Sequence, residues 1–335
     1  MAHERLRAWG MALAGLVMIA ALAVMTLAGC APGATTSHVA GPAPRYQHLF
    51  LIVMENSSYD DVIGSSNAPR VNALANQYGL ATNYWGVAHP SEPNYIALIG
   101  GDTFGVSDDN SYTVNALTKP NLATQLEGAG LSWKSYQQSL PYAGYTGETY
   151  PSDSPLYASK HNPFMNYLGA WPPSQRHQTL ARIVPDTQLA RDLASGSAPS
   201  FSFISPDLCH DMHGAPSCAF GPALTRAGDT YVGETVDMIL ASSVWKEENA
   251  AIIITWDEAD AGLSLGSPGI ATGGGHVPTL VITNHGPRGT RDDTPYNHYA
   301  LLRTIEDGFG LGCLRNSCPA TGNISPMTPL FAVTG

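Results

Sequence analysis

Basic residues are scarce in this sequence. Only 16 of its 335 residues are Lys or Arg, against 27 Asp or Glu, so the formal charge is −11 at pH 7. Proteins that bind nucleic acid need a basic surface that replaces the counterions of the phosphates. The composition therefore argues against a nucleic-acid-binding protein, and it specifies no oligomeric state.

Long apolar runs are absent after the first 30 residues. A helix needs about 20 apolar residues to span a bilayer, so the sequence argues against a protein with several membrane spans. Hydrophobic residues still make up 44% of the chain, and Gly (34) and Pro (25) are plentiful. This balance favours a globular domain with a large core and many loops.

The N-terminus has the features of a secretory signal. Arg5 and Arg7 precede an apolar stretch at residues 11–28, and the stretch ends in Leu-Ala-Gly-Cys, which resembles a bacterial lipobox. This predicts a signal peptide over residues 1–29 and a lipid on Cys30. An ordinary signal peptide and an uncleaved membrane anchor are the alternatives.

A lipid on Cys30 would place the protein outside the cytoplasm, anchored to the bacterial cell membrane. Residues 31–45 are rich in Pro, Gly and small residues and predict a flexible tether. The folded domain is expected over residues 46–335.

Cysteines are few, and four of the five form two close pairs in the sequence. In an oxidising compartment, Cys209 and Cys218, and Cys313 and Cys318, are expected to form two short-loop disulfides. Free buried thiols and crossed pairing are the alternatives.

Continuous apolar runs predict buried strands at residues 48–54, 200–204, 251–256 and 279–283. Helical patterns lie between them, at residues 67–78, 121–127, 228–245 and 297–309. The alternation predicts an α/β fold with a doubly wound, mostly parallel sheet covered by helices on both faces. Residues 136–182 are predicted to form a long excursion that covers or lines a site.

Acidic residues follow three of the predicted strands. They are Glu55 (with Asn56), Asp207, and Asp257 with Glu258 and Asp260. Ligands of open parallel sheets bind beyond the carboxyl ends of the strands, and crowded carboxylates repel unless a cation lies among them. Oxygen ligands suit Mg²⁺, Ca²⁺ or Mn²⁺, and added histidine widens the choice to Zn²⁺ or Fe.

Ser91 lies where a helix is expected to begin, in the segment "HPSEPNY". Its hydroxyl could cap the helix. It could equally be a nucleophile, because the free N–H groups of a helix start bind phosphate and a neighbouring metal would activate the hydroxyl. His89 could protonate a leaving group or pack in the core.

Seven segments of the chain occur in an order that resembles a known family. They are Glu55-Asn56, "HPSEPNY", "KHNPF", "CHDMHG", "TWDEAD", "GGGHVPTLVI" and "NHYALLRTIED". The chain resembles the bacterial phosphoesterase family that includes secreted acid phosphatases and phospholipases C, within the alkaline-phosphatase-like superfamily. The resemblance covers most of residues 46–331 and implies a phosphoesterase domain.

The resemblance also implies roles for individual residues. The metal would be held by Glu55, Asn56, Asp257 and Glu258, with His276 where the wider superfamily has a metal-binding histidine. Ser91 would be the nucleophile, and Asp211 and His213 would bind phosphate or a second metal. Asp257 is followed by Glu258 where the wider superfamily has a histidine, which leaves the second metal in doubt.

Further polar residues could contact the substrate. His161 and Asn162 could reach it from the excursion, or form a turn before Pro163. His298 could reach it from the start of the last predicted helix, or cap that helix. Glu306 is expected on the solvated face of the same helix.

The expected activity is metal-dependent hydrolysis of a phosphate monoester through a phosphoserine, as in an acid phosphatase. The absence of the long C-terminal extension of the phospholipases favours a small monoester, but a phosphodiesterase or phospholipase C is the alternative. A sulfatase is disfavoured because the segment after Ser91 lacks the Arg of the sulfatase motif. A non-catalytic lipoprotein that binds phosphate or metal is the alternative of another class.

Overall fold

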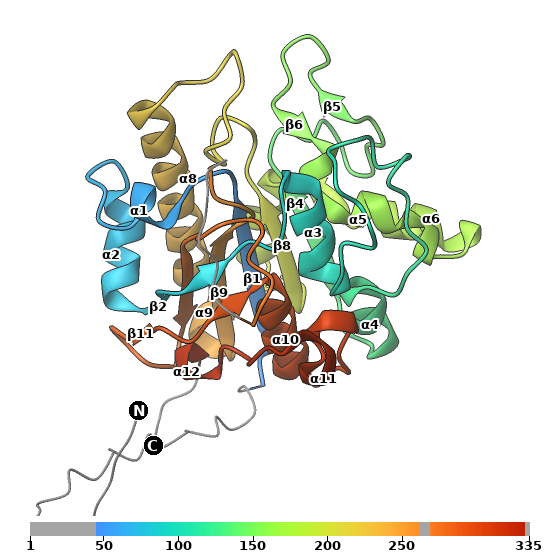
Figure 1. Ribbon diagram of the computed structural model, residues 1–335. Coiled ribbons are helices and arrows are strands. Elements are labelled where there is room, and N and C mark those ends of the chain that lie inside the picture. The colour runs from blue at the N-terminus through green and yellow to red at the C-terminus, as the bar shows by residue number, and fades with distance from the viewer. Residues whose placement is uncertain (1–44, 261–268, 332–335) are drawn as a thin grey trace, which may run out of the picture. The chain divides into compact units, whose positions relative to one another are not determined.

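An eight-stranded mixed sheet forms the centre of the fold in the computed structural model, which describes residues 45–260 and 269–331 (Figure 1). The predicted signal peptide, Cys30 and nearly all of the predicted tether lie outside the described residues. Within the described part, no helix has the length and apolar character needed to cross a membrane.

The strands of this sheet follow the order β11-β2-β10-β9-β1-β8-β4-β7. Their bounds are β1 His48–Met54, β2 Gly79–Ala81, β4 Trp133–Gln137, β7 Ile183–Pro185, β8 Phe201–Ser205, β9 Ala250–Trp256, β10 Thr279–Thr283 and β11 Arg291–Asp292. The strands β1, β8, β9 and β10 confirm the four predicted runs, and every residue in them is buried. Strand β10 is antiparallel to both of its neighbours, whereas all other pairs in the sheet are parallel.

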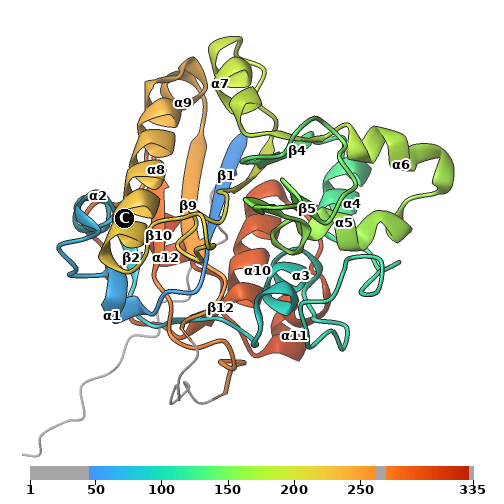
Figure 2. The same ribbon diagram turned by 90° about the horizontal axis from the view of Figure 1, so that it is seen from above.

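Helices cover both faces of the sheet. Figure 2 shows α2 (Pro69–Gln77), α7 (Thr187–Ala194), α8 (Pro222–Ala241) and α9 (Ser243–Glu247) on one face, and α3 (Ser91–Gly100) and α10 (His298–Phe309) on the other. The predicted helix at 228–245 is therefore two helices, α8 and α9, because the chain leaves the helical conformation at Ser242. This arrangement confirms the α/β prediction.

Helix α10 illustrates how the sequence sets an element's ends. The Asn297 side chain accepts hydrogen bonds from the N–H groups of Tyr299 and Ala300, both at 3.1 Å, which caps the start of the helix. Gly310 ends it with a φ of 72°, a conformation that glycine adopts at little cost. The alternative role of His298 as the cap is thus wrong.

Shorter elements surround the sheet. The remaining ones are β3 Tyr84–Trp85 with β12 Tyr296–Asn297, β5 Thr149–Tyr150 with β6 Tyr157–Ala158, α1 Tyr59–Val62, α4 Leu122–Gly128, α5 Pro163–Asn166, α6 Pro173–Leu180, α11 Pro319–Gly322, α12 Thr328–Phe331, and the 3₁₀ helices η1 Ser159–His161, η2 Tyr167–Ala170 and η3 Arg315–Ser317. Most of the predicted excursion is thus made of short helices and the β5–β6 hairpin, and η1 packs against α3.

Two disulfides join the cysteines that are close in the sequence, Cys209 to Cys218 and Cys313 to Cys318. The predicted local pairing is confirmed. Structural disulfides persist where thiols are not kept reduced, which indicates that the domain works outside the cytoplasm.

Glu306 lies in the interior, so its predicted place on a solvated face is wrong. It is fully buried, and one of its carboxylate oxygens accepts a hydrogen bond of 2.7 Å from the Ser317 hydroxyl. Ser317 belongs to η3, which packs over α10 and lies within the short loop that the Cys313–Cys318 disulfide closes. The outer face of α10 is therefore covered by a segment that comes later in the chain.

Candidate active site

The carboxyl ends of β1 and β9 bring two predicted site residues together. The strands are parallel neighbours in which Met54 pairs with Trp256, so the next residues, Glu55 and Asp257, lie side by side. The N–H of Asp257 donates to the Met54 carbonyl at 3.0 Å, and the N–H of Asn56 donates to Asp257 Oδ1 at 3.2 Å. Both acids are fully buried.

Ser91 faces these acids from the start of α3. Its hydroxyl lies 3.0 Å from Glu55 Oε2 and 3.0 Å from Glu258 Oε1, and its one proton can be donated to only one of them at a time. Pro90 occupies the cap position and no side chain caps this helix. The interpretation of Ser91 as a helix cap is therefore wrong, and its hydroxyl is directed at two carboxylates.

Two histidines extend the cluster. His89 Nδ1 is hydrogen-bonded to Glu258 Oε2, and this bond raises the pKa of His89. His161, on η1, is buried with Nε2 3.1 Å from Glu55 Oε1 and Nδ1 3.3 Å from Asp211 Oδ2. Burial lowers the pKa of His161, so the neutral imidazole with a free lone pair is favoured.

Asp211 and His213 reach the same place from the loop after β8. The N–H of His213 donates to Asp211 Oδ1 at 2.7 Å, and His213 Nδ1 donates to the Gly214 carbonyl at 2.8 Å. This second bond leaves Nε2 as the nitrogen that can accept a proton or bind a metal. Potential ligand atoms of Glu55, His161 and His213 all lie within 4.8 Å of one another, a spacing that would suit a metal ion.

Burial and neighbouring negative charges make ionisation of the acids in the cluster unfavourable. Burial, then the charge of Asp211, raises the pKa of Glu55 well above its usual range. Burial raises the pKa of Asp211 well above its usual range, and burial followed by the charge of Glu55 does the same for Asp257. A cation among them would remove this penalty.

Several buried side-chain atoms in the cluster have no hydrogen-bond partner among the residues that the structure describes. They are Glu55 Oε1, Asn56 Oδ1, His161 Nε2, Asp211 Oδ2 and Asp257 Oδ2. Buried polar atoms in folded proteins nearly always have a partner. Four acceptor oxygens and an imidazole nitrogen that share one sheet edge are the donor set of a divalent metal, so these residues fit a bound cation.

Other predicted residues have no described contact with the cluster's side chains. His276 is stacked between the rings of Tyr59 and Trp85, and its Nε2 donates to the Thr82 carbonyl at 3.1 Å. Asn162 is fully buried, and its Oδ1 accepts a hydrogen bond of 3.3 Å from Ser135.

His298 and Asp207 support the site through its backbone. His298 Nε2 donates to the Asp257 carbonyl at 2.5 Å, and its Nδ1 accepts from the Tyr84 hydroxyl at 3.0 Å. Both ring nitrogens are thus occupied, which leaves none for a substrate. The Asp207 carboxylate accepts hydrogen bonds from the Ser139 hydroxyl at 2.7 Å and the Cys209 N–H at 3.0 Å.

Two neighbours of the cluster were missed from the sequence. The Tyr95 ring stacks on His161 with centroids 5.3 Å apart, and its hydroxyl has no partner. Tyr95 follows Ser91 by four residues, and this spacing puts both on one face of α3, so it could have been found. Lys160 directly precedes His161 in the segment "KHNPF", and no spacing in the sequence distinguishes it from a surface lysine.

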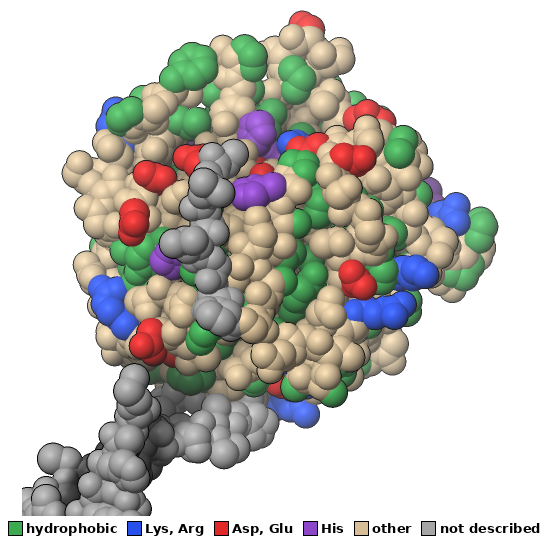
Figure 3. Space-filling view, in the orientation of Figure 1, with side chains coloured by type: hydrophobic (Ala, Val, Ile, Leu, Met, Phe, Trp, Pro, Cys, Tyr) green, Lys and Arg blue, Asp and Glu red, His purple; other side chains and the backbone are tan. Residues whose placement is uncertain are grey.

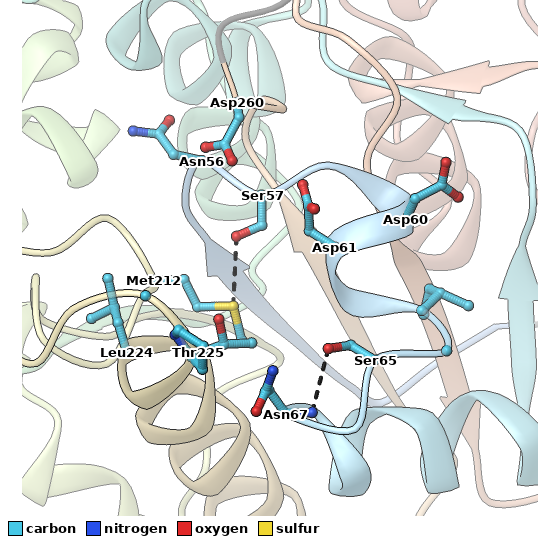
Figure 4. Close-up of a pocket in the computed structure, with 14 residues that line it drawn as sticks. Asn56, Ser57, Asp60, Asp61, Ser65, Asn67, Met212, Leu224, Thr225 and Asp260 are labelled. Carbon is cyan, nitrogen blue, oxygen red and sulfur yellow. Dashed lines mark hydrogen bonds between the residues drawn. The ribbon is translucent and has the colours of Figure 1, made fainter.

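A cavity of about 640 Å³ adjoins the cluster. Figure 4 shows Asn56 and Asp260 at one end of it, with Ser57, Asp61 and Met212 along its walls. Asp260 is near enough to Glu258 for that charge to contribute, after burial, to a raised pKa of Asp260. Figure 3 shows histidine and acidic side chains gathered on the upper part of the face in view. The cluster therefore borders a polar cavity that could receive part of a ligand.

A family model, described as the Phosphoesterase family, matches residues 65–312. The chain belongs to the Phosphoesterase family. Among its relatives is an acid phosphatase from Aspergillus fumigatus, 32% identical over 84% of this chain and 59% of the relative. Another is a phosphatidylinositol-3-phosphatase from Mycobacterium tuberculosis, 30% identical over 97% of this chain and 94% of the relative. The chain thus spans about three-fifths of the fungal relative's length and nearly all of the mycobacterial one's.

Solved structures similar to this member of the Phosphoesterase family support the fold. An alkaline phosphatase superfamily protein from Vibrio parahaemolyticus has a TM-score of 0.53 at 16% identity, covering 80% of this chain and 68% of that one. A phosphonate monoester hydrolase from Agrobacterium radiobacter has a TM-score of 0.53 at 16% identity, covering 85% and 77%. The predicted alkaline-phosphatase-like fold is confirmed.

Proposed function

We propose that this protein is a metal-dependent phosphate monoester hydrolase that acts through a phosphoserine on Ser91. The observation that carries the proposal is the Ser91 hydroxyl, 3.0 Å from two carboxylates at the start of a helix. Relatives named acid phosphatase and phosphatidylinositol-3-phosphatase support the same reaction class.

Residues of the cluster that offer oxygen or nitrogen ligands would hold the metal. Glu55, Asn56 and Asp257 would supply oxygens, and His161 and His213 would supply imidazole nitrogens close to Glu55. A divalent cation there would polarise a phosphoryl oxygen and favour the alkoxide of Ser91. The oxygen donors suit Mg²⁺, Mn²⁺ or Ca²⁺, and the imidazole nitrogens widen the choice to Zn²⁺ or Fe.

Ser91 would attack the phosphorus atom while its proton passes to the Glu55 or Glu258 oxygen 3.0 Å away. The new bond joins Ser91 Oγ to phosphorus, and the bond from phosphorus to the alcohol oxygen breaks. His89 or His213 would give the leaving oxygen its proton. His89 is the better placed in one respect, because its ring is one-third exposed and contacts the carboxylate that also faces Ser91.

Water would complete the cycle by attacking the phosphoserine. The bond between phosphorus and Ser91 Oγ then breaks, phosphate leaves, and Ser91 takes back a proton. The N–H of Ser91 at the start of α3 would stabilise a phosphoryl oxygen during both steps. The next N–H, that of Glu92, is already donated to Asp109. The cavity beside Asn56 is a place for the alcohol part of the ester.

Turnover of p-nitrophenyl phosphate by the purified soluble domain tests this proposal. Activity that needs a divalent metal and Ser91 would support it. Faster turnover of bis-p-nitrophenyl phosphate or phosphatidylcholine would favour a phosphodiesterase or phospholipase C instead. Tight phosphate binding without turnover under any divalent metal would favour a non-catalytic binding protein.

We also propose that the mature chain begins at a lipidated Cys30 and is anchored to the cell membrane. The support is the Leu-Ala-Gly-Cys segment after an apolar stretch. Replacing Cys30 by Ser should move the protein from the membrane fraction to the soluble fraction. Equal distribution of both forms would contradict the anchor.

A further inference from the structure

Lys160 places a positive charge beside the carboxylate cluster. It lies on η1 directly before His161, whose ring is between Glu55 and Asp211. Its charge acts on both of these acids and on His213. None of the residues given a catalytic or metal-binding role above is a Lys or Arg, so the cluster has no other permanent cation among its own members.

Lys160 is held in position from the loop before α4. Its ammonium nitrogen lies 2.6 Å from Asp109 Oδ2, and Asp109 Oδ1 accepts the N–H of Glu92 at 2.9 Å. Glu92 follows Ser91 in α3, so the Lys160–Asp109 pair is fixed to the same helix turn that carries the proposed nucleophile. A lysine ammonium has three donors, and Asp109 is its one described partner.

The Lys160 side chain is 22% exposed, whereas Glu55 and Asp211 are almost entirely buried. A buried lysine that only balanced the acids would be enclosed with them. This lysine instead keeps part of its side chain at the surface, where an anion can approach it.

We propose that Lys160, positioned by Asp109, is an anion-binding subsite that receives a phosphoryl oxygen of the substrate. The inference rests on the proposed function and adds a residue to it. A phosphate monoester is a dianion near neutral pH, and it must approach a site lined with acids. Lysine suits this role because it acts as a compact point charge that binds phosphate.

The decisive measurements are KM for p-nitrophenyl phosphate and the inhibition constant of inorganic phosphate. Lys160→Met should raise both at least tenfold, and Lys160→Arg, which keeps the charge, should recover most of the loss. Asp109→Asn should raise the phosphate inhibition constant less than Lys160→Met does, because it removes the partner that positions Lys160 but keeps the Lys160 charge.

A matched control is Lys134, which forms an ion pair of the same 2.6 Å length with Asp192 and is 29% exposed. Lys134→Met removes a similar pair elsewhere in the fold, and it should leave both constants within threefold. The proposal would be overturned if Lys160→Met raised KM and the phosphate inhibition constant less than tenfold. It would also be overturned if Asp109→Asn raised them equally, because Lys160 would then only anchor the loop.

Calorimetry of phosphate binding to the Ser91→Ala protein, with Mg²⁺ or Mn²⁺ present, separates this inference from the proposed function. Adding Lys160→Gln should weaken phosphate binding at least tenfold even though no turnover occurs. If the unaltered protein showed no turnover, the proposed function would be wrong. Weaker phosphate binding on adding Lys160→Gln would still support the subsite in that case. Equal phosphate affinity with and without Lys160→Gln would overturn the subsite alone.

Discussion

Ser91 and Glu55, 36 residues apart in the chain, meet at a hydroxyl-to-carboxylate distance of 3.0 Å. The contact lies in the interior of the protein, because Ser91 is 1% exposed and Glu55 is fully buried. Burying an acid without a cation is unfavourable. A carboxylate at this distance can accept the proton of a hydroxyl nucleophile.

We expect Ser91→Ala to lower kcat for p-nitrophenyl phosphate by at least about a thousandfold, because the attacking atom is removed. The measurement is initial rate under saturating substrate. Ser202→Ala, which removes a fully buried hydroxyl in β8, is the control and should keep most of the activity. Comparable activity in Ser91→Ala and the unaltered protein would exclude Ser91 as the nucleophile.

Removal of metal should abolish activity and lower the thermal stability together. A ligand that binds only the folded state at about 100 times its Kd contributes about 2.7 kcal/mol, so the Tm should fall by several degrees on chelation and recover on adding metal. The readouts are metal analysis, calorimetric Tm and turnover. If chelators changed neither the Tm nor the activity, the proposed metal site would be wrong.

The same experiment distinguishes the acids at the strand ends. Asp257→Asn should lose the response of Tm to added metal, because Asp257 Oδ2 is one of the buried atoms without a partner. Asp207→Asn should keep that response, because Asp207 is engaged by Ser139 and Cys209. If both variants respond alike, the cluster around Asp257 is not the ligand set.

The sequence predicts the positions of residues that directly follow buried strands. It does not predict the surroundings of residues that are covered by distant segments of the chain. Glu55 and Asp257 follow apolar runs that read as parallel strands, so their meeting could be predicted. The position of Glu306 could not, because η3, which covers it, has no apolar pattern of its own and is brought over α10 by tertiary packing. The surroundings of His298 are likewise set by distant segments. Only the fold shows that the Tyr84 hydroxyl and the Asp257 carbonyl occupy its two ring nitrogens, so the sequence alone leaves a contact with substrate open.

Asp229→Ala should destabilise the domain by about 1–3 kcal/mol. Asp229 lies on α8 and is buried, and its carboxylate accepts the N–H groups of Arg70 (3.1 Å) and Val71 (2.8 Å) at the start of α2. These donors have no partner within their own helix. Urea unfolding measures the change, and catalytic constants should stay near those of the unaltered protein.

Asp237→Ala on the same helix is the matched control for Asp229. Asp237 pairs with the Arg70 side chain, but its own side chain is 68% exposed, and exposed ion pairs contribute about 0–1 kcal/mol. Equal losses in the two variants would mean that Asp229 does not cap α2.

Glu306→Gln should change how stability depends on pH. Burial raises the pKa of Glu306 from its usual 4.5 to about 7, so the folded protein holds a proton between these values that the unfolded chain releases. Stability from this group is therefore greatest below pH 4.5 and is lost as the pH rises to about 7. The loss is about 3 kcal/mol if the shift of about 2.5 units is converted at about 1.4 kcal/mol each.

Gln cannot ionise, and it can still accept the Ser317 hydroxyl, so the variant should lack this loss. As the pH rises from 4.5 to 8, the variant should therefore become more stable relative to the unaltered protein, as measured by the free energy of unfolding. Glu247→Gln is the matched comparison, because it removes a carboxylate that is exposed, and it should give a much flatter difference. A parallel pH dependence in Glu306→Gln and the unaltered protein would show that Glu306 is already ionised in the folded state, and that Arg303, 3.7 Å away, outweighs its burial.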